Sequence, residues 1–243
     1  MTASYAGNSQ YTPATASTAF VVTKALITVV TTPVAVAAGW TLISLPLAPL
    51  NPVSAATVLA GVLQSSGGHQ AAIYALTNNQ WAPALMQVGT GAPTGTNFIL
   101  QPGQGYLISS NKAGSYTETG IVPASQPTWH VIAGWNLVGV MLGAPGPIHA
   151  STVLKGVLQR SGGSMVALSA LSNTRWSPSL TLLSSGTFIG QDFTLQPGVG
   201  YRLYTNPGVS YTPGTASGQA PGQQGSTGGA VPLPALPPLP GLP

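Results

Sequence analysis

An internal repeat restricts what this chain can fold into more than any other feature of its sequence. Shifting the sequence by 95 positions aligns residues 38–117 with residues 133–212 without a gap, at roughly 45% identity. Each copy is long enough to bury a core of its own. The chain is therefore expected to contain one module twice in tandem.

The positions that both copies retain are mostly glycine, proline, tryptophan and aliphatic residues. Acids and histidines are not retained, and the chain has no cysteine. A catalytic group would be expected to survive in at least one copy with its partners, so the retained set indicates architecture. The fold-defining aromatic residues are Trp40, Trp81 and Tyr106 in the first copy and Trp135, Trp176 and Tyr201 in the second.

Each copy has the pattern of a β-rich module with one short helix. Residues 40–47 alternate like a half-buried strand, and residues 54–64 carry one apolar stripe at helical spacing, with Ser54 as N-cap and Gly67 at the C-terminus. The Pro-Gly pair within 101–105 is typical of a tight turn between two strands. We predict a mainly β fold, with two modules that resemble β-sandwiches or barrels and one short α-helix in each.

The repeat also divides the chain into segments. Residues 38–120 form the first module, 121–132 a linker and 133–215 the second module. Residues 1–37 are an N-terminal β arm, and the Gly, Gln and Pro-rich tail of 216–243 is typical of a linker that ends in polyproline II.

The arm contains a long β-branched segment with little sequence of its own to pair with. An exposed strand edge invites the addition of a strand from another chain. The arm is thus predicted to join the sheet of a neighbouring subunit and to give an open-ended assembly. The assembly residues are Phe20, Val21, Val22, Ile27 and Val29.

The chain is unusually poor in charge. It has six Lys or Arg and two acidic residues, and these few cations are scattered, so they offer no stripe for a nucleic-acid backbone. No stretch has the roughly 18 consecutive apolar residues of a membrane-spanning helix. The sequence therefore predicts neither a nucleic-acid partner nor a membrane span.

Enzymatic activity is not expected either. The two carboxylates, Glu118 and Asp192, lie in different modules, and neither has an acidic counterpart in the other copy. His69, His130 and His149 lack ligand-like spacing, so no metal or other cofactor is predicted.

Carbohydrate binding is the alternative function, because sugars stack on exposed aromatic rings. A repeated tryptophan inside an apolar strand is more often a core anchor. Tyr74 and Trp129 do not repeat, and they are therefore the candidate stacking residues.

Two parts of the chain resemble known families. The Gly-Trp openings at 39–46 and 134–138, with the Leu-Gln-Pro-Gly-x-Gly-Tyr segments at 100–106 and 195–201, resemble a module of bacterial and archaeal cell-surface proteins. Residues 2–24 resemble the last two strands of a bacterial immunoglobulin-like repeat, a unit of surface stalks. The resemblance implies an extracellular or cell-surface location.

Taken together, the sequence predicts a non-enzymatic extracellular structural or adhesive protein, a surface stalk or filament subunit. Its predicted partners are copies of itself, other surface proteins or glycans. A carbohydrate-binding accessory module remains the alternative.

Overall fold

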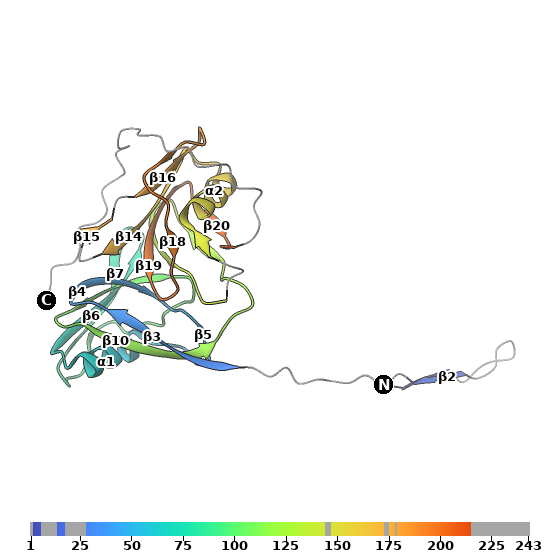
Figure 1. Ribbon diagram of the computed structural model, residues 1–243. Helices are drawn as coiled ribbons and strands as arrows, with labels where there is room; N and C mark the ends of the chain where they lie inside the picture. The colour runs from blue at the N-terminus through green and yellow to red at the C-terminus, as the bar shows by residue number, and fades with distance from the viewer. Residues whose placement is uncertain are drawn as a thin grey trace.

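The structure, a computed structural model, describes residues 2–5, 14–17, 28–143, 147–172, 175–177 and 179–214. This part of the chain is mainly β, with antiparallel sheets and two helices, which confirms the predicted fold class. Figure 1 shows two β-rich bodies stacked on each other, one blue to green and the other yellow to orange. We refer to residues 28–121 as module 1 and to the described part of 122–214 as module 2.

Module 1 has two sheets and one helix. Its main sheet has the order β4 (Gly39–Ser44), β9 (Gly105–Ser110), β6 (Gln70–Thr77), β7 (Gln80–Val88) and β8 (Thr94–Gly95). The second sheet has the order β3 (Val29–Val36), β10 (Gly114–Ile121) and β5 (Ala48–Pro49). Helix α1 (Ala55–Ser66) contacts both sheets, and the hydrophobic core lies between these elements.

Module 2 repeats the strand order of the main sheet and the position of the helix, but not the three-stranded second sheet. Its main sheet has the order β12 (Gly134–Gly139), β19 (Gly200–Asn206), β14 (Met165–Ser172), β16 (Leu180–Leu183) and β17 (Phe188–Ile189), and β15 (Arg175–Trp176) also pairs with β14. Two short sheets pair β11 (Trp129–Val131) with β20 (Val209–Tyr211) and β13 (Ile148–His149) with β18 (Thr194–Leu195). Helix α2 (Ala150–Ser161) packs on this body.

The predicted helix is confirmed in module 1. The Ser54 hydroxyl accepts a hydrogen bond from the Thr57 N–H at 3.1 Å, which satisfies one of the free donors at the helix start. Gly67 ends the helix in the left-handed conformation, with a φ of 58°. The apolar stripe Val58, Leu59, Val62 and Leu63 is buried.

The repeated Gln-Pro-Gly-x-Gly-Tyr segment has a structural explanation. The Gln101 N–H donates a hydrogen bond of 2.6 Å to the Tyr106 hydroxyl, which closes the turn onto the strand that follows it. Gly103 has a φ of 83°, a value that favours glycine. The second copy repeats the bond, from the Gln196 N–H to the Tyr201 hydroxyl at 2.7 Å.

Strand β3 corrects the predicted extent of the N-terminal arm. It pairs with β10 of the same chain over its whole length, from Val29 opposite Ile121 to Val36 opposite Gly114. Val34 and Val36 are buried in the core of module 1. Residues 29–36 therefore belong to module 1, and Val29, predicted as an assembly residue, is already paired within its own chain.

Strand β11 gives the same correction for the predicted linker. Val131 pairs with Val209, and Trp129 pairs with Tyr211. These pairs are equivalent to the pairs of Val36 with Gly114 and of Val34 with Tyr116, which lie 95 positions earlier in β3 and β10. The linker is therefore shorter than 121–132, because its last residues form a strand of module 2.

Ahead of module 1, β1 (Thr2–Tyr5) and β2 (Ala14–Ser17) form an antiparallel two-stranded sheet. Phe20, Val21, Val22 and Ile27 lie outside the described residues, as does the tail predicted for 216–243. Among the helices that are described, none has both the length and the apolar character needed to cross a membrane.

The two modules are related by an internal two-fold axis. The Ser44 N–H donates to the Gly198 carbonyl, and the Gly139 N–H donates to the Gly103 carbonyl, both at 3.0 Å. Adding 95 to Ser44 gives Gly139, and adding 95 to Gly103 gives Gly198, so each bond is the symmetry mate of the other. This is the isologous geometry of a two-fold dimer, built here inside one chain.

The axis passes between Ser44 and Gly139, which are equivalent residues in the two copies. A Cβ atom placed on Gly139 would lie 2.1 Å from the Cβ of Ser44, so the second copy has to carry glycine here. A shared apolar cluster flanks the axis and combines Trp40, Leu42 and Leu107 of module 1 with Leu137 of module 2. The modules consequently form one continuous body.

Candidate functional site

The repeated aromatic residues serve the fold of the modules and the interface between them. Trp40, Trp135, Tyr106 and Tyr201 are all buried. Trp81 and Trp176 are half-buried against the apolar cluster that joins the modules. Their rings are therefore engaged with protein.

Arg202 occupies the space between two of these rings. Its guanidinium carbon lies 4.1 Å from the centre of the Trp176 ring and 4.8 Å from the centre of the Trp135 ring. The Arg202 Nε donates to the Ser169 hydroxyl. Burial lowers the pKa of Arg202 to about 10, so it stays charged at neutral pH. Leu107 holds the equivalent position in module 1.

The two residues predicted to stack on sugars are not exposed platforms. Trp129 is 3% exposed, and its indole N–H donates to the Gly139 carbonyl at 3.0 Å. Tyr74 is half-buried, with its ring centre 5.7 Å from that of Trp40. The structure does not bring Tyr74 and Trp129 together on one surface.

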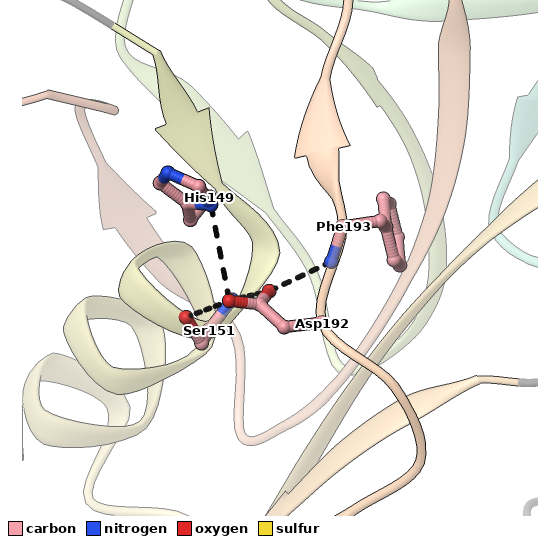
Figure 2. A network of polar contacts seen from close by, with 4 residues as sticks. All are labelled: His149, Ser151, Asp192 and Phe193. Carbon is pink, nitrogen blue, oxygen red and sulfur yellow. Dashed lines mark hydrogen bonds and ion pairs between the residues drawn. The ribbon is translucent and has the colours of Figure 1, made fainter. Parts of the chain in front are cut away.

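One polar cluster contains the residue types of a catalytic triad. Figure 2 shows the Asp192 carboxylate facing Ser151 and His149 at the start of α2. The Ser151 hydroxyl donates to Asp192 Oδ2 at 2.6 Å, and the N–H groups of Ser151 and Phe193 both donate to Oδ1 at 2.9 Å. His149 Nδ1 is 3.9 Å from Asp192 Oδ2.

This connectivity is that of a helix cap. A catalytic serine would donate to the histidine, but Ser151 donates to the carboxylate instead. In module 1 the equivalent of Asp192 is Asn97, whose Oδ1 accepts the Ala56 N–H at 3.1 Å. Both copies therefore use a distant side chain to cap the helix, and the carboxylate of module 2 also suits the positive end of the helix dipole.

The other carboxylate, Glu118, is isolated inside module 1. It is fully buried on β10, and neither of its oxygens makes a hydrogen bond to a residue that the structure describes. Burial raises its pKa to about 7, and the nearby Leu47 backbone lowers it in part. Within the described ranges, no three His, Asp or Glu side chains come together as a metal site.

A cleft between the modules is the candidate binding site. It has a volume of about 410 Å³, which falls within the roughly 300–1,000 Å³ of small-molecule sites. Module 1 contributes the end of β6 with its turn and the 101–105 turn, and module 2 contributes β11 and β12. The polar side chains that line it are Thr77, Asn78, Gln101, Gln104, Thr128, His130 and Asn136.

Several of these polar groups are held in place by the protein. Gln104 Oε1 accepts the Tyr106 hydroxyl at 3.1 Å, and His130 Nδ1 lies 2.9 Å from the Ser210 hydroxyl. Asn136 Oδ1 accepts the Ile132 N–H at 2.9 Å. The Gln104 amide nitrogen and His130 Nε2 belong to exposed side chains, so both can face a ligand.

Of the two predicted stacking residues, Trp129 lines this cleft and Tyr74 does not, but the sequence did not indicate the cleft or its polar lining. The two-fold axis brings together turns and strands that lie far apart in the chain, and no single motif marks them. A residue-by-residue comparison of the copies over 33–37 and 128–132 could have found the signal. No family model, curated protein or solved structure matches the chain.

Proposed function

We propose that this chain is a non-enzymatic structural or adhesive protein of the cell exterior, a stalk or filament subunit that assembles by β-strand addition. The two modules supply one continuous body, and the region ahead of them supplies the joining strands. Its partners are copies of itself or other surface proteins.

The β1–β2 hairpin is the observation that carries this proposal. In the described residues, each of its strands pairs only with the other. A two-stranded hairpin is only marginally stable in water, so it gains stability by joining a larger sheet. The exposed sheet edge of a neighbouring subunit offers such a sheet.

The body of the chain offers a receptor edge. Strand β3 is the outer strand of the β3–β10–β5 sheet, and Val29 at its beginning is 50% exposed. Pro33 within β3 lacks a backbone N–H, which limits where a partner strand can pair. Strand addition at this edge would link subunits head to tail.

Negative-stain imaging of the purified protein tests the proposal. The full chain is compared with a variant lacking residues 1–27, which keeps β3, and with a control variant lacking residues 215–243. Filaments are expected from the full chain and from the control, and none from the variant without 1–27. Dispersed particles from the full chain, or filaments without residues 1–27, would refute assembly through this region.

A further inference from the structure

We infer that the cleft between the modules is a binding site for a neutral saccharide. The inference does not depend on filament assembly, because the cleft lies within the two-module body. Its polar lining includes Gln101, Gln104 and Asn78 of module 1 and His130 of module 2.

Each residue of the cleft has an equivalent in the other copy of the module. Comparing the two shows which residue types the fold itself requires at that position. The Cβ built on Gly103 would contact Trp129, and that built on Gly198 would contact Val34, which is the equivalent of Trp129. The 196–200 turn thus lies next to Val34 of β3 as the 101–105 turn lies next to Trp129 of β11, although the other neighbours differ, Pro46 at Gly198 and Pro127 at Gly103.

The two sets differ in polarity at three positions. Gln104, Thr128 and His130 line the cleft, whereas the related positions hold Val199, Pro33 and Ala35. The same fold and the same interface form with apolar residues at the related positions. Folding therefore does not require Gln104, Thr128 and His130, and recognition of a ligand explains these three polar residues. The other polar lining residues, such as Gln101 and Asn78, have polar counterparts in the other copy.

The chemistry of the lining selects the class of ligand. Among the residues that the structure describes, no Lys, Arg, Asp or Glu lines the cleft, so these residues offer no permanent charge to an ionic ligand. Carboxamides both donate and accept hydrogen bonds, which matches hydroxyl groups that do the same. The three carboxamides of Asn78, Gln101 and Gln104 with the imidazole of His130 therefore fit a neutral, polyhydroxylated molecule.

The test begins with the full chain on a printed array of neutral and acidic glycans. The strongest neutral glycan is then titrated by saturation-transfer NMR, a method that tolerates large assemblies. The variant Gln104→Val/His130→Ala introduces into the cleft the residues that the other copy has at the equivalent positions, Val199 and Ala35. The fold already accepts these residues there. The control Val199→Gln/Ala35→His makes the reverse change away from the cleft.

We expect at least one neutral glycan to bind and the cleft variant to bind it roughly tenfold more weakly, since two hydrogen bonds are lost. The control variant is expected to bind like the unchanged protein. Binding of acidic glycans alone, no glycan binding, or equal affinity of the cleft variant would overturn the inference. None of these results depends on whether filaments form.

Discussion

Glu118 makes the stability of module 1 depend on pH. Its folded pKa of about 7 exceeds the ordinary 4.5, so the folded chain holds this proton more tightly than the unfolded chain does. The free energy of unfolding should be highest below pH 4.5, fall as the pH rises to about 7 and then level off. The total loss is on the order of 3 kcal/mol.

Urea unfolding at several pH values from 4 to 8, on the unchanged chain and on Glu118→Gln, measures this effect. The glutamine variant keeps the shape of the side chain but cannot ionise, so its stability should change much less over that range. A variant that loses stability with pH as steeply as the unchanged chain would show that another group is responsible.

Single residues were predictable where their role is local. The helix cap at Ser54 and the tight turn at the Pro-Gly pair of 101–105 follow from short-range rules, and both were predicted from the sequence. Trp129 was not, because it does not repeat and its burial depends on Tyr211, which lies far along the chain. The burial of Glu118 likewise depends on contacts that no sequence pattern displays.

At the scale of elements, β3 makes two N-terminal truncations differ in their expected effect on stability, although the predicted arm of 1–37 gave no reason to distinguish them. Removing residues 1–27 leaves β3 in place. Removing residues 1–37 takes away the buried Val34 and Val36 and every partner that β10 has in β3. Each valine contributes about 1.5–3 kcal/mol of burial, so only the longer truncation should destabilise module 1 strongly.

Thermal unfolding followed by circular dichroism distinguishes these two variants. The variant lacking 1–27 should melt with the unchanged chain, and the variant lacking 1–37 should melt well below it. Equal melting of the two truncated chains would contradict the assignment of β3 to module 1.

The helices and the turn hairpins were predictable because apolar spacing and turn chemistry are local. β3 was placed in the arm because identity between the copies is low before Ala38 and because its partner β10 lies some 85 residues later. Strand pairing over such a separation is set by the tertiary fold. For the same reason β11 was placed in a linker.

For the whole molecule, the sequence predicted two modules but not how they pack together. The axis depends on a pair of equivalent residues, Ser44 and Gly139, that differ because only one side chain fits between the modules. The cleft arises from this packing, so it could not be located before the modules were placed. Aromatic residues interpreted as core anchors of one module turned out also to form the interface.

The most direct test of this account is a double-mutant cycle at the two-fold axis, measured as the free energy of unfolding in urea. Gly139→Ser places two side chains where one fits and should cost about 1–3 kcal/mol. The exchanged variant Ser44→Gly/Gly139→Ser should recover most of that loss, because one side chain again lies at the axis. If Gly139→Ser were harmless, or if the exchange restored nothing, the two-fold packing of the modules would be wrong.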